Sequence, residues 1–204
     1  MLLHSYHNLD TKILLEASEE VNWYNVNAVF DIDNVTEIDH YPDTIGRWKY
    51  KNRYYELNKK NNWMRWDYAG EKFSYTWSKK INVGDKMNDA EKTISEQVKK
   101  FMDILNVSDY GFRFLKLKPT DKMIWHIDSP NHAPSAFNIS LKDKSPIVFE
   151  NEEMVYDSAL IDVSKYWHTV KAGKEERLTF KIVPKINYQE MQHRLSVNGF
   201  LPSN

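Results

Sequence analysis

The segment RLTFKIV, residues 177–183, alternates between polar and apolar side chains from Arg177 to Ile182. Side chains of a β-strand point to opposite faces in turn, so Leu178, Phe180 and Ile182 share one face and the polar residues share the other. Two interpretations are open at this point. The polar face meets water, as in an ordinary two-sided sheet, or it lines an interior pocket while the apolar face packs under a helix.

Short segments of similar character precede this strand, with turn signals such as Pro119-Thr120-Asp121 between them. Evenly spaced short strands are typical of a sandwich or barrel, and we expect a mainly β fold of the jelly-roll type. The further expected strands are residues 112–118, 123–128, 135–141, 147–150, 154–156, 160–163 and 166–171.

The first half of the chain has a mixed pattern. Asn88 or Asp89 is a suitable N-cap for a helix that runs to about Leu105, with apolar residues at helical spacing. We expect one domain over residues 1–204, with an N-terminal support region (1–110) of a bracing helix and strands, a jelly-roll core (111–184) and a C-terminal tail (185–204). Other expected elements are strands at 26–32, 48–57 and 72–77, a turn at 41–44, a polar loop at 58–62 and a short helix at 188–195.

Composition excludes several classes of site and partner. The 204 residues include no cysteine, which rules out disulfides, thiolate metal sites and cysteine nucleophiles. The net charge of −1, without a basic block, disfavours nucleic acid as a partner. No apolar stretch is long enough to span a membrane, and no secretory signal is visible, so we expect a cytoplasmic protein.

A candidate metal site comes from His126, Asp128 and His168. On a strand, His126 and Asp128 would share one face with Cα atoms roughly 6.6 Å apart. Two histidines and one carboxylate are the usual cage for non-haem iron(II). A lone His-x-Asp pair is weak, since each residue has an ordinary structural interpretation. The prediction depends on its conjunction with His168 and with Arg177 on the next expected strand.

This pattern, His-x-Asp followed by a distal His and then Arg-x-Thr within residues 111–184, resembles the iron(II)/2-oxoglutarate-dependent dioxygenases. The resemblance implies a double-stranded β-helix in which His126, Asp128 and His168 bind Fe(II). It further implies that Arg177 and Thr179 bind the distal carboxylate of 2-oxoglutarate. Such an enzyme uses 2-oxoglutarate and O2 as co-substrates, releases succinate and CO2, and here is expected to be a hydroxylase.

The remaining expectations concern the pocket and what enters it. Asn138 shares the small polar face of its strand and is a candidate pocket residue, against a solvent-facing alternative. The substrate, an amino-acid side chain of a protein or peptide or a small metabolite, is expected near residues 131–134 and 63–75. His132 and Tyr166 are weaker candidates for the pocket, and solvated positions explain Arg113 and Lys116 equally well.

Two alternatives to an enzyme stay open. One is a cupin-like jelly roll that binds a metal or ligand without oxygenase turnover, although a bare metal binder needs no carboxylate clamp such as Arg177 with Thr179. The other is a structural β-sandwich in which these residues coincide by chance. The sequence makes no prediction of oligomeric state.

Overall fold

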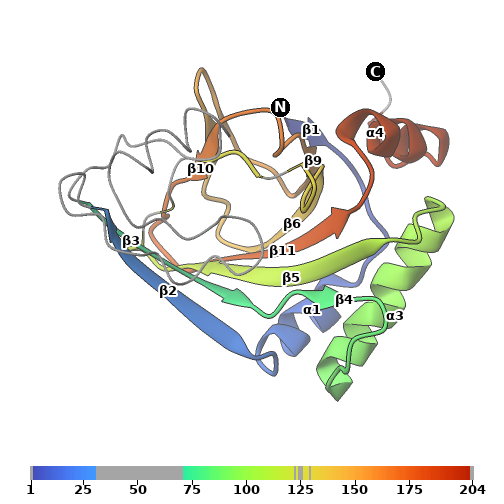
Figure 1. The fold of residues 1–204 in the computed structure, drawn as a ribbon, viewed down its shortest axis with the longest axis horizontal. Coiled ribbons are helices and arrows are strands. Elements are labelled where there is room, and N and C mark those ends of the chain that lie inside the picture. Colours follow the sequence, from blue (N-terminus) through green and yellow to red (C-terminus); the bar gives the residue numbers. More distant parts are fainter. Residues whose placement is uncertain (1, 31–70, 122, 124–125, 129, 203–204) are drawn as a thin grey trace.

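The strands form two antiparallel sheets, one large and one small (Figure 1). The computed structural model describes residues 2–30, 71–121, 123, 126–128 and 130–202. In the large sheet the strand order is β1-β9-β6-β11-β5-β3-β2, with β4 paired beside β5, and the small sheet has the order β10-β7-β8. The strands of the large sheet are β1 (Leu2–His4), β2 (Trp23–Phe30), β3 (Glu71–Ser78), β4 (Ile81–Asn82), β5 (Tyr110–Leu117), β6 (Ala136–Lys142), β9 (Ser158–Ile161) and β11 (Arg177–Pro184). Those of the small sheet are β7 (Ile147–Phe149), β8 (Glu153–Met154) and β10 (His168–Val170).

The order of pairing defines a jelly roll. The last strand, β11, returns between β5 and β6, and β6 pairs on its other side with β9. In the opposite sheet β10 pairs with β7 and, through an isolated bridge at His168, with His126. The chain therefore visits the two sheets in the pattern of two Greek keys, which is the double-stranded β-helix expected from the sequence.

All three described helices contribute to one core on the outer face of the large sheet. Helix α3 (Asp89–Ile104) begins with a capping box in which Asn88 and Glu91 exchange hydrogen bonds, and it buries Ile94, Val98 and Phe101. Helices α1 (Thr11–Ser18) and α4 (Tyr188–Val197) contribute to the same apolar cluster. The bracing helix expected from Asn88 onward is confirmed, and Figure 1 shows α1 and α3 on the side of the large sheet away from β10.

The two faces of β11 have different environments. Leu178, Phe180 and Ile182 are fully buried in the cluster under the helices. Arg177 and Thr179 are also buried, although they point to the other side, toward the interior of the roll. Of the two interpretations left open by the sequence, the pocket-lining one is correct.

The expected strand at residues 123–128 is wrong for its described residues. Only His126 makes a bridge, through two backbone hydrogen bonds of 3.0 Å with His168. Two residues later the N–H of Asp128 donates to the carbonyl of Val163 instead, at 2.8 Å, so the ladder does not continue. Because the regular ladder is lost, the side chains here are placed by these separate contacts and not by strand alternation.

Other boundaries differ by a few residues. Strand β2 begins at Trp23, three residues before the expected start, while the short strands β1 and β4 and helix α1 were not expected. The expected turn at 41–44, strand at 48–57 and loop at 58–62 lie outside the described residues, as do residues 31 and 32 of the first expected strand. Among the described helices, none combines the length and apolar content that crossing a membrane requires.

Candidate metal centre and adjoining cavities

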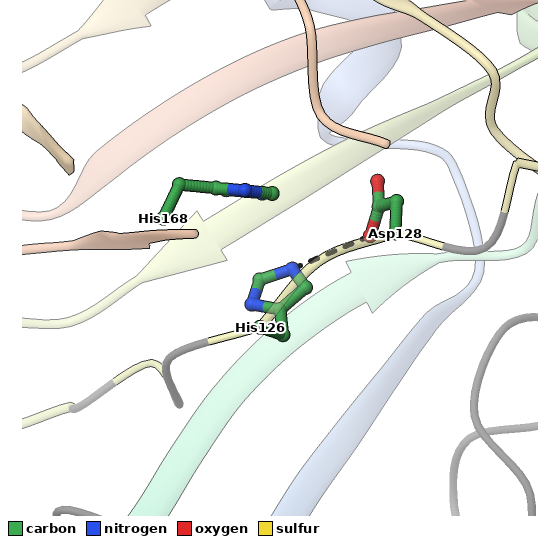
Figure 2. Close-up of side chains that lie close together, drawn as sticks. All are labelled: His126, Asp128 and His168. Atoms are coloured by element: carbon green, nitrogen blue, oxygen red, sulfur yellow. Dashed lines mark ion pairs between the residues drawn. The ribbon is translucent and has the colours of Figure 1, made fainter. Parts of the chain in front are cut away.

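Three side chains from two separate segments of the chain converge between the sheets. His126, Asp128 and His168 each present a potential ligand atom, and these atoms all lie within 4.8 Å of one another (Figure 2). The ring Nε2 of His126 is 3.4 Å from Oδ1 of Asp128, and the centroids of the two imidazoles are 4.3 Å apart. The paired backbone hydrogen bonds between His126 and His168 set this approach, because directly opposed residues hold their Cβ atoms close together.

The protonation state of His168 suits a metal ligand. Its Nδ1 is 3.0 Å from the carbonyl oxygen of Tyr166. A carbonyl only accepts hydrogen bonds, so Nδ1 donates and the lone pair is on Nε2. Burial, together with the neighbouring His126, lowers the pKa of His168 from 6.5 to about 3. The ring is therefore neutral at physiological pH, which is the form that binds a metal.

Asp128 is a buried but ionised carboxylate. Burial alone raises its pKa, but the nearby Lys181 and the contact with His126 outweigh this effect and hold the pKa well below its ordinary value. The Nζ of Lys181 donates to Oδ2 of Asp128 at 2.8 Å, while Oδ1 faces His126. One carboxylate oxygen is thus oriented by a cation, and the other belongs to the cluster of potential ligand atoms.

The donor set fits a divalent metal that keeps open coordination positions. Two imidazoles and one carboxylate are harder than a thiolate site and match the facial triad of non-haem iron(II). His168 and Asp128 are both held by a second hydrogen-bonding partner, as metal ligands usually are. His126, Asp128 and His168 are therefore the residues that would hold the ion.

A cavity beside this cluster contains the two residues expected to bind a carboxylate and the candidate pocket residue Asn138. Arg177, Thr179 and Asn138 all line it, and all three are buried. The phenol oxygen of Tyr156 accepts hydrogen bonds from Nη2 of Arg177 at 2.7 Å and from Nδ2 of Asn138 at 3.2 Å. We refer to this space, also lined by Thr76, Leu115, Lys116, Leu117, Met123 and Val170, as the Arg177 cavity.

The polar groups of the Arg177 cavity are incompletely satisfied. Within the described residues, Nε of Arg177 and Oδ1 of Asn138 are buried without a hydrogen-bond partner. An unsatisfied buried polar atom costs roughly 1–3 kcal/mol, and more when the group is charged. No carboxylate is among the described residues that line the cavity, and Arg177 brings positive charge to it. These groups fit a ligand that is anionic.

A second cavity shares two lining residues, Leu115 and Met123, with the Arg177 cavity. It includes His126 and Asp128, so it gives access to the triad. We refer to it as the Asp128 cavity; its other lining residues are Trp77, Lys80, Arg113, His132, Ala133, Lys181 and Val183.

The expectations for the weaker candidates have mixed outcomes. His132 and Ala133, from the loop expected near the substrate, do line the Asp128 cavity. Tyr166 lines neither cavity. It precedes β10 and is 40% exposed, at a different hollow that Phe149 and Trp167 also line. Residues 63–70 lie outside the described residues.

Two residues of the site were not anticipated from the sequence. Tyr156 follows the very short β8, and nothing in its local pattern indicates that its hydroxyl meets Arg177 and Asn138. Lys181 was placed on the polar face of its strand, and its parity with Arg177 and Thr179 was a signal that it also points inward.

Comparisons with known proteins give only distant likenesses. No family model and no curated protein matches this chain. A 2OG-Fe(II) oxygenase family oxidoreductase from Burkholderia pseudomallei is similar at 12% identity and a TM-score of 0.40, covering 91% of this chain and 95% of its own. A prolyl-4-hydroxylase from Pseudomonas putida has 11% identity and a TM-score of 0.35, covering 54% of this chain and 70% of its own. A cupin-2 domain-containing protein from Shewanella frigidimarina has 20% identity and a TM-score of 0.31, covering 37% of this chain and 70% of its own. Values this low assign no function to the chain, and the proposals below depend on its own residues.

Proposed function

We propose that this protein is an Fe(II)- and 2-oxoglutarate-dependent dioxygenase that hydroxylates an amino-acid side chain or a small metabolite. The observation that carries the proposal is the convergence of His126, Asp128 and His168 beside a cavity with a buried, incompletely satisfied Arg177. Fe(II), when bound with 2-oxoglutarate, activates O2 for hydroxylation with release of succinate and CO2.

Arg177 gives the Arg177 cavity its affinity for a carboxylate. The planar guanidinium can donate two hydrogen bonds to one carboxylate, and its Nε has no partner among the described residues. Tyr156 orients the guanidinium through Nη2, and Thr179 lines the cavity two residues along the same face of β11. In our proposal this is the end of the cavity that holds the distal carboxylate of 2-oxoglutarate.

Asn138 and Tyr156 position the co-substrate further. The Oδ1 of Asn138 is buried without a partner, so it is suited to accept from a donor brought by the ligand or by an ordered water. The Tyr156 oxygen already accepts from two donors, so its own hydrogen is suited to an acceptor such as a carboxylate oxygen. The chain thus offers a pre-arranged set of donors and needs little reorganisation on binding.

Lys181 orients Asp128 and keeps it ionised. Its ammonium group is bonded to Oδ2, so the carboxylate cannot rotate freely and Oδ1 stays directed at the cluster. Burial of the triad restricts the water that reaches it, because Asp128 is 5% and His168 4% exposed. Both effects favour a reaction confined to what the two cavities admit.

Anaerobic spectroscopy followed by exposure to air tests the proposal. The metal-free protein receives Fe(II) and then 2-oxoglutarate, and we expect a weak visible charge-transfer band and release of succinate once air is admitted. Metal uptake without succinate would indicate a cupin-like binder, and neither metal uptake nor succinate would indicate a structural sandwich. Either of these results would overturn the proposed function.

A further inference from the structure

Lys181 brings a cation into direct contact with the candidate metal centre. Its Nζ donates to Oδ2 of Asp128 at 2.8 Å, and the two side chains are only 15% and 6% exposed. Strand β11 lies between β5 and β6 in the large sheet, and the backbone of Lys181 is in register with a residue on each side. The ammonium group is therefore held beside the triad, where solvent screens its charge weakly.

This ammonium group offsets the charge that the ligand set would otherwise present to a metal. His126 and His168 bind a metal only as neutral imidazoles, so Asp128 supplies the negative charge of the three ligands. With Lys181 paired to Asp128, the ligands and the ammonium group together carry no net charge. A divalent ion at the triad would keep both of its positive charges and would be repelled by Lys181.

The position of Asp128 does not depend on Lys181 alone. The N–H of Asp128 donates to the carbonyl of Val163 at 2.8 Å, and Oδ1 lies 3.4 Å from Nε2 of His126. Neither contact involves the side chain of Lys181. Replacing Lys181 by a neutral residue should thus affect metal binding more through the lost charge than through the lost hydrogen bond.

Lys181 also lies next to the Arg177 cavity. Its register partner on β6 is Asn138, which lines that cavity, and directly opposed residues of a sheet hold their Cβ atoms about 4.5–5.5 Å apart. Arg177 and Thr179 precede Lys181 on the same face of β11. A cation at this position attracts an anion in the Arg177 cavity and repels a metal at the triad.

We infer that Lys181 lowers the affinity of the triad for its metal and raises the affinity of the metal-loaded site for an anionic co-substrate. The two effects have opposite signs because the metal and the co-substrate have opposite charges. The protein alone then holds the metal weakly, and it holds the metal more tightly once an anion offsets the charge of the ion, a linkage that is reciprocal. The inference rests on the proposed function for the identity of this anion as 2-oxoglutarate.

Calorimetric titration of the full-length chain with Mn²⁺ tests the inference without any turnover, because Mn²⁺ binds the same kinds of N and O ligands as Fe(II). Lys181→Met removes the charge and keeps a long side chain. We expect this variant to bind Mn²⁺ about tenfold more tightly, and its Mn²⁺-loaded form to bind 2-oxoglutarate about tenfold more weakly. Lys181→Arg keeps the charge and should return both affinities to near the wild-type values. The matched control Lys99→Met removes the cation of an exposed ion pair with Asp103 on α3 and should change neither affinity.

Opposite changes in the two affinities support the inference, since removal of a purely orienting lysine would weaken the binding of Mn²⁺. Weaker, unchanged or absent binding of Mn²⁺ in Lys181→Met overturns it, as does unchanged or tighter binding of 2-oxoglutarate. If Lys181→Met does not fold, Lys181→Gln removes the charge and keeps a hydrogen-bond donor, and the same outcomes decide. If the wild type binds Mn²⁺ but not 2-oxoglutarate, the proposed function is refuted, and the effect of the substitution on Mn²⁺ affinity alone decides whether Lys181 acts on the metal.

Discussion

The two faces of β11 are buried to a similar extent, yet their side chains differ in chemistry and in what they contact. On the outer face, Leu178, Phe180 and Ile182 are buried in the apolar cluster under the helices. On the inner face, Arg177 and Thr179 border a cavity and Lys181 holds a carboxylate. Burial alone therefore does not distinguish a structural position from a functional one in this fold, whereas the chemistry of the buried group does.

The energetic consequences differ accordingly. Apolar burial contributes roughly 25 cal/mol per Å² to stability, so the outer face favours folding. The inner face keeps buried polar atoms without partners, at Arg177 Nε and Asn138 Oδ1 among the described residues, and such atoms oppose folding until a ligand satisfies them. Substitutions on the two faces should thus separate loss of stability from loss of binding.

The largest effect is expected from Phe180→Ala on the outer face. Phe180 is fully buried between Phe112 and Phe114, with ring centroids 5.7 and 4.9 Å away. Removing a buried phenylalanine side chain costs about 3–5 kcal/mol of unfolding free energy. Urea denaturation measures this loss, and the matched surface change Val197→Ala should cost far less. A loss below about 1 kcal/mol would show that the outer face is not the stabilising one.

Removal of a triad side chain should abolish metal binding with little loss of fold. We expect His168→Ala to weaken Fe(II) binding by more than about a hundredfold. Even the loss of a residue that hydrogen-bonds to a metal ligand lowers metal affinity by about ten- to a hundredfold. His193→Ala, on α4 and outside the triad, is the control. Iron content and the anaerobic absorption band are the measurements, and a band that survives in His168→Ala would refute the ligand assignment.

Arg177→Leu should affect binding and not stability. Loss of a hydrogen bond to a charged group, about 1.5–3 kcal/mol, corresponds to roughly ten- to a hundredfold weaker binding of 2-oxoglutarate. The melting temperature should stay unchanged or rise, because a buried charge is replaced by an apolar side chain. Iron binding should be retained, and Lys174→Leu serves as the charge control. An unchanged 2-oxoglutarate requirement would remove Arg177 from the site.

The buried neutral His168 predicts a pH dependence of stability. Its pKa is about 3 when folded and 6.5 ordinarily, so between these values the unfolded chain binds more protons. Stability is complete above about pH 6.5 and falls by up to about 1.4 kcal/mol per pH unit below it. The depressed pKa of Asp128 causes a further loss of stability, but only below pH 3.8, the ordinary pKa of this carboxyl group. Urea denaturation at pH 7, 6 and 5 gives the unfolding free energies of metal-free wild type and His168→Gln, and the difference between the two should shrink as the pH falls. A difference that stays constant over this range would exclude the titration of His168 as the cause.

The smallest effect is expected from Tyr156→Phe. The change removes the oxygen that accepts from Arg177 and Asn138 and leaves the ring in place. A net hydrogen-bond contribution of about 0.5–1.5 kcal/mol implies roughly two- to tenfold weaker binding of 2-oxoglutarate. Tyr6→Phe, at an exposed position, is the control for loss of a phenol oxygen. Unchanged affinity in Tyr156→Phe would limit Tyr156 to packing.

Sequence periodicity predicted the elements whose faces differ most in polarity. The alternation in residues 177–183 and the helical spacing from Asn88 to Leu105 correspond to β11 and α3. Helix α1 is short, and its N-cap Asp10, which accepts from the N–H groups of Lys12 and Ile13, was a usable signal. The segment around His126 could not be predicted, because its conformation depends on backbone contacts with Val163 and His168 that are remote in sequence.

The candidate ligands were predictable as residue types, but their partners were not. His126, Asp128 and His168 follow from a motif, and the structure brings them together. The ion pair between Lys181 and Asp128 and the contacts of Tyr156 depend on how the strands are paired. Pairing order is a tertiary property that a single sequence does not specify through local periodicity.

A crystal structure of the protein prepared anaerobically with Fe(II) and 2-oxoglutarate tests the central claim most directly. We predict an iron ion bonded to His126, Asp128 and His168, with the distal carboxylate of 2-oxoglutarate at Arg177. Iron bound at other residues, or His168 turned away from the ion, would contradict the account.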